Sequence, residues 1–270
     1  MGHANSTVGD LLRSWRELKG CSQLDLAIEA AISQRHLSFI ESGRSAPSRE
    51  MVLHLARHLE IPLRERNAIL LAAGFAPVFR DRPLDDPALA PAKASIDVLL
   101  KAYEPYPALT VDRHWNIVSA NRGVSSLLKM VDAELLKPPA NALRISLHPR
   151  GLAPHILNLA QWRGHLLERL RRQLRINRDP VLDSLLRELN GFDSDAAVES
   201  APRQEISPDE IAIPLRLSTP QGILSFLSTV TVFGTPVEIT LSELTLEAFC
   251  PADEETAAVL SRGSSLARPE

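Results

Sequence analysis

The stretch "SQLDLAIEAAISQRHLSFIESGRSAP", residues 22–47, contains two short helical patterns separated by a turn. Ser22 and Asp25 have the spacing of a capping box, which predicts that the first helix begins here. In the second pattern, Leu37 and Ile40 are three residues apart and can face a core, while the polar residues around them point elsewhere. A capped helix, a turn of about three or four residues and a second helix are typical of a helix-turn-helix unit.

Helical patterns also flank this unit on both sides. Residues 8–19 carry apolar side chains at helical spacing, and a glycine follows them. Beyond the unit, Pro47 and Pro62 stand at the starts of two more helices, the second of which reaches Gly74. We therefore predict an all-α domain of five helices in residues 1–75.

The two helices of the motif have a predicted apolar face and a predicted cap. In the first helix, Leu24, Ala27 and Ile28 fall on one side. We expect these three side chains to form its apolar face. Ser33 can cap the start of the second helix.

Composition and charge are those of an ordinary globular protein. Of the 270 residues, 44% are hydrophobic and 23% are charged, which allows one large domain or two modest ones. Residues 1–75 carry nine Lys and Arg against eight Asp and Glu, a net charge of +1, and the remainder carries 21 against 25, a net charge of −4. The charge therefore neither indicates nor excludes a nucleic-acid partner.

Apolar runs and cysteines exclude several other classes of protein. The longest apolar runs, such as 69–73, are too short to cross a bilayer, and the N-terminus lacks a signal-peptide pattern. We expect a cytoplasmic protein without a membrane partner. Cys21 and Cys250 lie far apart without metal-type spacing, so we expect no metal site and no disulfide framework.

A proline-rich segment separates the helical domain from the rest of the chain. Residues 76–93 contain four prolines and charges of both signs, which is typical of a linker with at most one helical turn. We expect a second domain in residues 94–255 and a tail in residues 256–270.

The second domain alternates between strand and helix patterns. Helices are expected in residues 121–131, 153–176 and 180–190, and residues 193–208 are expected to form a loop. Short runs of alternating apolar residues predict an antiparallel sheet of about five strands. The strand candidates are residues 109–111, 115–120, 211–217, 223–233 and 237–249. In the last candidate the apolar residues change from odd to even numbers near Ser242, which we attribute to a β-bulge.

The N-terminal domain resembles the helix-turn-helix domain of the XRE family over residues 7–74. The motifs "SQLDLA" and "ISQRHLSFIESGRSAP" and the proline-initiated fourth helix all fall in register with it. The resemblance implies a DNA-binding domain. It also implies that a helix-one arginine, Arg16, and Glu41 form a partly buried ion pair that supports the second helix of the motif.

The same resemblance assigns DNA contacts to individual residues. It implies that Gln23 binds a backbone phosphate and that Gln34 and Arg35 reach base edges in the major groove. Ser38 would offer a hydroxyl one turn further on, while Phe39 would either contact a thymine methyl or pack against the protein. Ser33 and Arg44 complete the predicted set, Arg44 as a phosphate contact.

The second domain resembles the PAS-like ligand-binding domain of MmyB-like regulators over residues 95–253. The segment "PYPALTVDRHWNIVSANRGVSSLL" is similar to the opening strands and helix of that fold, and "SFLSTVTVFGTPVEITLSELTLEAFCPAD" is similar to its closing strands. An ordinary PAS domain lacks the long helical centre at residues 121–205. The resemblance implies an α+β domain that senses a small molecule.

The inward face of the predicted sheet is almost wholly aliphatic, which suits an apolar ligand such as a fatty acid. We predict Trp115, Trp162 and Phe226 as wall residues and Arg144 or His148 as the anchor for a carboxylate. The aromatic content of only 4% argues against a flat, stacked cofactor, and a haem bound by a histidine stays open as an alternative. The alternative is a core filled by its own side chains, which would leave the domain for dimerisation or partner binding.

Two alternatives remain for the function. The first is a sequence-specific transcription regulator that binds a palindromic operator as a homodimer. The second is a non-enzymatic adaptor whose helix-turn-helix has lost DNA binding. No phosphate loop, nucleophile elbow or metal-binding pattern indicates an enzyme. The arginine-rich segment 162–178 is either a solvated helix face or a secondary contact for DNA or a second subunit.

Overall fold

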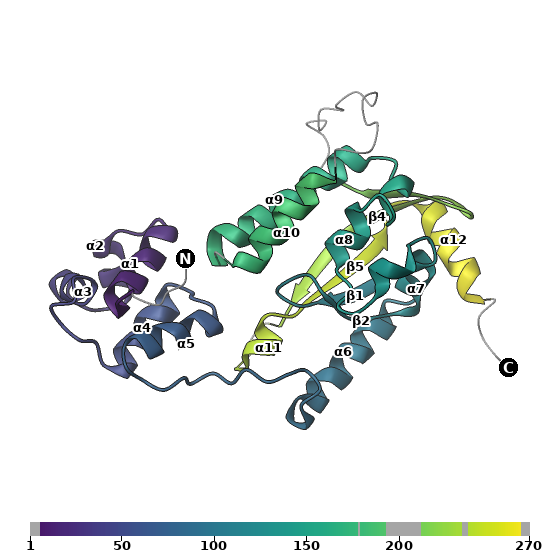
Figure 1. Cartoon of the computed structure of the whole chain (residues 1–270). Helices are drawn as coiled ribbons and strands as arrows, with labels where there is room; N and C mark the ends of the chain where they lie inside the picture. The colour runs from purple at the N-terminus through teal and green to yellow at the C-terminus, as the bar shows by residue number, and fades with distance from the viewer. Residues whose placement is uncertain (1–5, 178, 193–211, 234–236, 266–270) are drawn as a thin grey trace. The chain divides into compact units, whose positions relative to one another are not determined.

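The computed structural model describes residues 6–177, 179–192, 212–233 and 237–265. The chain forms two compact units (Figure 1). The first comprises residues 1–86 together with 234–242, and the second comprises residues 87–233 and 243–270. The short segment 234–242 therefore belongs to the N-terminal unit although it interrupts the sequence of the C-terminal one.

The first unit is the predicted helical domain. Side chains of Thr7, Ser22, Ser33 and Ser48 accept hydrogen bonds from the first turns of four of its helices, and both Thr7 and Ser22 form complete capping boxes. The prediction of five helices in this region is confirmed. They are α1 (Val8–Leu18), α2 (Gln23–Glu29), α3 (Gln34–Glu41), α4 (Arg49–His58) and α5 (Leu63–Ala72).

The core of this unit corrects the predicted apolar face of α2. Leu37 and Ile40 are fully buried as expected, but Leu24 and Ile28 are 51% and 69% exposed. Ala27 is buried as expected, but the other buried positions are Leu26 and the C-cap residue Ala30, and α2 packs against α3. Three apolar positions on a helix of two turns can define more than one face, and the neighbouring helices decide which face is buried.

The second unit contains one five-stranded sheet in which every neighbouring pair is antiparallel, with the strand order β2-β1-β5-β4-β3. The α+β domain with a sheet of about five strands is thus confirmed. Its strands are β1 (Ala108–Val111), β2 (Ile117–Ala120), β3 (Leu215–Thr219), β4 (Gly222–Val232) and β5 (Thr245–Pro251).

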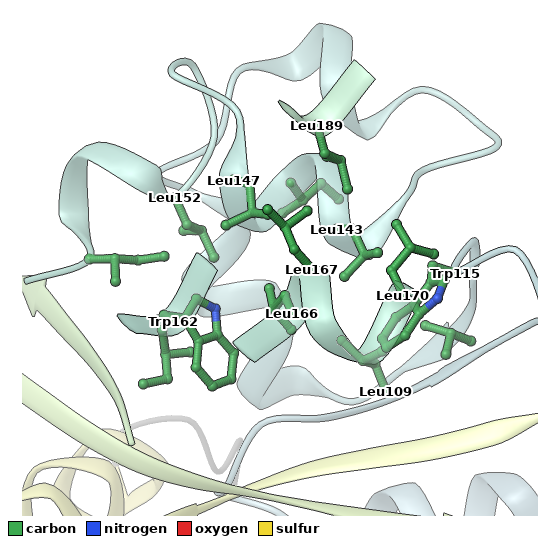
Figure 2. Close-up of a cluster of buried hydrophobic side chains, with 14 of the residues drawn as sticks. Leu109, Trp115, Leu143, Leu147, Leu152, Trp162, Leu166, Leu167, Leu170 and Leu189 are labelled. Atoms are coloured by element: carbon green, nitrogen blue, oxygen red, sulfur yellow. The ribbon is translucent and has the colours of Figure 1, made fainter. Parts of the chain in front are cut away.

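Helices cover the sheet of the second unit and supply most of its core (Figure 1). Leucines of α9 lie against Leu109 of β1 and the leucines of α8 and α10 (Figure 2). The helices are α6 (Ala90–Ala102), α7 (Arg122–Leu128), α8 (Ala142–Leu147), α9 (Leu159–Asn177), α10 (Pro180–Gly191) and α12 (Glu254–Ser265), with three short 3-10 helices, Pro87–Leu89, Ala133–Leu136 and Ala153–His155.

The predicted last strand is confirmed from Thr245 onward, but its first half and the bulge are wrong. Residues 239–242 form a short helix, α11 (Ile239–Ser242), and β5 begins only at Thr245. The change of parity near Ser242 arises because Ile239 is buried in the first unit, whereas Leu246 and Ala248 belong to the sheet of the second. The alternating apolar pattern of residues 237–249 therefore spans residues that belong to two different units.

Other boundaries also differ from those expected. Helical structure begins at Pro87, inside the segment expected as a linker, and α12 occupies most of the expected tail. Trp115, expected in a strand, lies in the turn before β2 with a φ of +68°. The loop expected at residues 193–208 lies outside the described residues.

Candidate functional site

The first turn of α3 presents the predicted base-reading side chains to solvent. Gln34 and Arg35 are exposed, while Leu37 and Ile40 anchor the opposite side of the helix in the core. The hydroxyl of Ser33 accepts a hydrogen bond from the backbone N–H of His36 at 3.1 Å, which fixes the start of the helix. Packing and capping thus hold the helix while its polar face stays open.

Phe39 connects two of the predicted DNA-contacting arginines. Its half-buried ring lies 5.3 Å from the guanidinium carbon of Arg35 and 5.9 Å from that of Arg44. Among the described residues neither arginine has an ion-pair partner, so both guanidinium groups keep their donors for another anion. Stacking on an aromatic face narrows the range of positions that each arginine samples.

A buried network under α3 joins α1, α2 and α3. Arg16 donates from Nε to Oε1 of Glu41 at 2.7 Å and from Nη2 to Oε2 at 3.0 Å. Its third contact, from Nη1 to the carbonyl oxygen of Cys21, measures 2.8 Å. The hydrogen bond with Glu41 raises the pKa of Arg16, so its guanidinium stays charged.

Gln23 is part of the same network. Its Nε2 donates to Oε2 of Glu41 at 2.7 Å, so the side chain predicted to bind a phosphate already has a partner within the protein. Glu41 thereby accepts three hydrogen bonds, two from α1 and one from α2. This arrangement holds Gln23 at the first turn of α2 in one position.

Gly9 allows α1 and α3 to approach closely. A Cβ added there would lie 2.5 Å from the carbonyl oxygen of Ile40 and 2.7 Å from that of Glu41. Only a residue without a side chain fits between the two helix backbones at this point. The placement of α3 therefore depends on a glycine that sequence reasoning did not single out.

The three predicted ligand-wall residues lie in one buried cluster of the second unit. Phe226 of β4 is fully buried, and the indole N–H of Trp162 donates to the hydroxyl of Ser146 at 3.0 Å. The indole N–H of Trp115 donates to Oε1 of Gln173 at 2.9 Å. Figure 2 shows Trp115 and Trp162 packed among leucines of the surrounding helices.

The two predicted carboxylate anchors already have partners. Arg144 of α8 forms a bidentate pair with Glu188 of α10, at 2.7 and 2.8 Å. His148 accepts a hydrogen bond at Nδ1 from the backbone N–H of Arg150 at 2.9 Å. Burial lowers the pKa of His148, which favours its neutral form.

Sequence reasoning missed two polar contacts in this unit. Arg169 of α9 donates to Glu247 of β5 at 2.6 Å and lies over the ring of Trp115 at 4.7 Å. His114 meets the carboxylate of Asp179 at 2.8 Å. The glutamate between the apolar residues of β5 was the available signal, since a charged residue inside an apolar strand requires a partner.

The described part of the chain holds no group of His, Cys, Asp or Glu side chains able to bind a metal ion. Within the same residues, every buried side-chain nitrogen or oxygen has a hydrogen-bond partner. None of the described helices has the length and apolar character needed to cross a membrane.

A helix-turn-helix unit with an open polar face, followed by a helix-covered antiparallel sheet, defines a DNA-binding transcription regulator with a separate ligand-binding domain. Residues 12–66 match the helix-turn-helix family, and residues 92–262 match the MmyB-like transcription regulator ligand binding domain. Because the second match covers more than half of the chain, the protein belongs to the MmyB-like family. Both resemblances drawn from the sequence are thus confirmed. No curated protein matches the chain.

Proposed function

We propose that the protein reads a specific DNA sequence with α3 and adjusts its binding in response to a small hydrophobic ligand. The observation that carries the DNA-reading part is that Arg35 on the exposed first turn of α3 and Arg44 in the loop after α3 both lie over the ring of Phe39. Arg35 and Gln34 have the donor geometry for guanine and adenine edges, respectively. In this proposal Ser33 and Ser38 add hydroxyl groups to the DNA-reading surface, and Arg44 binds a backbone phosphate.

Site selection from a random DNA pool tests this part directly. The expected result is one enriched motif for the full chain and loss of enrichment for an Arg35→Ala, Gln34→Ala double variant. A variant at Val98, which is exposed on α6 of the other unit, serves as the control. Recovery of no motif by the unaltered chain would favour the adaptor alternative, in which the helix-turn-helix no longer binds DNA.

For the second unit we infer a ligand with an apolar body, such as a fatty acid, held by a PAS-like domain. The supporting feature is the cluster around Trp115, Trp162 and Phe226, in which aliphatic side chains predominate. Entry of a ligand among residues as buried as these requires the helices to separate from the sheet. Ligand binding would then change how the helices of this unit pack against its sheet.

The anchor for a carboxylate would be Arg144 or His148, and each has a distinct requirement. Arg144 must release Glu188 before it can hold a ligand carboxylate in the same bidentate geometry. His148 must take up a proton, against the effect of its burial. Arg144 needs no change of protonation, which makes it the better anchor at neutral pH.

Organic extraction of the purified protein followed by mass spectrometry tests for a resident ligand. Titration with dodecanoic acid, monitored through tryptophan fluorescence, tests binding to the emptied protein. We expect Arg144→Leu to weaken that binding more than it weakens binding of dodecanol, which lacks the carboxylate. A protein that yields no extractable lipid and does not respond to dodecanoic acid would leave the second unit as a dimerisation or partner-binding module.

We also propose that the protein acts in the cytoplasm, without enzymatic activity, and binds a palindromic operator as a homodimer. One helix-turn-helix module offers few base contacts, so two modules are needed for a specific site.

A further inference from the structure

The connection between β4 and β5 leaves the sheet and becomes part of the other unit. Val232 at the end of β4 pairs with Thr245 at the start of β5, so the two ends of the connection are neighbours in the sheet. Between them, residues 234–242 belong to the unit that contains the helix-turn-helix. We call residues 237–242, which include α11, the strap.

Glu238 fastens the strap to the segment that follows α5. Its side chain is buried, with Oε1 accepting from the backbone N–H of Arg82 at 2.8 Å and Oε2 from that of Leu241 at 3.2 Å. The carboxylate thus caps the short helix of the strap and binds the chain leading away from α5 at the same time. Loss of this side chain removes both contacts together.

Two neighbouring residues extend the same junction. The backbone N–H of Ile239 donates to the carbonyl oxygen of Arg80 at 2.9 Å, and its side chain is only 2% exposed. The hydroxyl of Thr240 donates to the carbonyl oxygen of Arg82. The strap is therefore held by backbone pairing, a buried apolar side chain and side-chain hydrogen bonds.

The segment held by the strap is in turn fastened to α5. Asn67 of α5 accepts hydrogen bonds from the backbone N–H groups of Val78 and Phe79 and donates to the carbonyl oxygen of Phe79 at 2.7 Å. Arg64 of α5 pairs with Asp81, with one N–O distance of 3.0 Å. A continuous set of contacts therefore runs from the strap through residues 78–82 to a helix of the DNA-binding unit.

We propose that the strap transmits changes in the sheet of the ligand-binding unit to α5 and residues 78–82 of the DNA-binding unit. Because both ends of the connection lie at the same end of the β4–β5 pair, a shift of this pair moves the strap as a whole. The covalent path through the strap acts in addition to the one through residue 86. The coupling itself does not depend on a ligand, whereas its use in regulation rests on the proposed function.

Hydrogen–deuterium exchange on the full chain tests the first step, the docking of the strap. We expect Glu238→Ala to speed exchange in α5 and in residues 78–82 by about fivefold, since a buried carboxylate with two backbone donors is lost. Val237→Ala is the matched control, because Val237 lies on the same strap and is 83% exposed. Unchanged exchange in both segments of the Glu238 variant would overturn the proposal.

A second variant tests transmission from the sheet. Leu246 of β5 is buried and pairs with Thr231 of β4 near the strap, so Leu246→Ala should loosen that end of the sheet. We expect Leu246→Ala to speed exchange in α5 as well. In a chain that already carries Glu238→Ala, adding Leu246→Ala should cause no further increase. Transmission through the strap is refuted if Leu246→Ala leaves exchange in α5 unchanged, or if it speeds that exchange equally with and without Glu238.

Leu246→Val repeats this test if the alanine variant does not fold. Neither measurement uses DNA or a ligand. If both exchange tests give the expected result but the chain selects no DNA motif, transmission through the strap is supported and the proposed function is contradicted. A failure of one proposal can therefore be distinguished from a failure of the other.

Discussion

At the scale of single residues, we expect variants of Arg35 and Gln23 to separate base reading from general affinity for DNA. Arg35 stands free on α3 beside Phe39, whereas Gln23 is already bonded to Glu41. We expect Arg35→Ala to relax preference at one base pair in each half-site and to cost about 1–3 kcal/mol of binding free energy. Competition binding with the selected site and its single-base variants measures both effects.

Gln23→Ala is the comparison for the Arg35 variant. It removes a predicted phosphate contact and a hydrogen bond to Glu41, so we expect weaker binding to every sequence without a change in preference. If the two variants alter base preference in the same way, the roles assigned to these residues are wrong.

At the scale of elements, the contact between α1 and α3 depends on Gly9. We expect Gly9→Ala to push the two helices apart and to destabilise the helical unit by about 1–3 kcal/mol. DNA binding should weaken for all sequences, because α3 moves while its base-reading side chains are unchanged. Chemical denaturation together with binding to the selected site measures these effects.

Gly164 of α9 provides the matched control. It also lies within a helix, but nothing lies within 4 Å of a Cβ added there. Gly164→Ala should be neutral or stabilise its helix by up to about 1 kcal/mol. Similar destabilisation by the two substitutions would show that helix packing at Gly9 is not the cause.

His165 gives α9 a pH-dependent contribution to stability. Burial, with a smaller effect of Arg169, lowers the pKa of His165, whose ring stacks on Trp162 at 5.5 Å. The unfolded chain therefore takes up the proton first, and the free energy of unfolding should fall as the pH drops from about 7 to 5.5. His148, whose pKa is also lowered by burial, contributes in the same direction.

Thermal unfolding followed by tryptophan fluorescence at a series of pH values measures this dependence. We expect His165→Gln to flatten part of it, because glutamine stays neutral throughout the range. An unchanged slope in the variant would assign the dependence to other groups.

At the scale of the whole molecule, we expect two copies of the chain on each operator. Their α3 helices should read half-sites about 34–36 Å apart on one face of the duplex. Footprinting should then show a palindromic site, and the mass of the complex should give two chains per duplex. One chain on an asymmetric site would contradict this prediction.

Local patterns in the sequence were sufficient for much of the fold. Caps such as Ser22 and Ser33, with apolar residues at helical spacing, predicted the helices of residues 1–75, because capping and periodicity act over a few residues. The same patterns placed Gln34 and Arg35 at the exposed start of α3. The Arg16–Glu41 pair, separated by 25 positions, came only from the family resemblance.

Only the tertiary structure decided which surfaces meet. Alternation in residues 237–249 indicated burial, but it did not show that Ile239 is buried in one unit and Leu246 in the other. The exposure of Ile28 and the pairing of Arg169 with Glu247 could not be predicted from the sequence for the same reason. A side-chain pattern records how apolar a face is, whereas the partner of that face is set by chain segments distant in sequence.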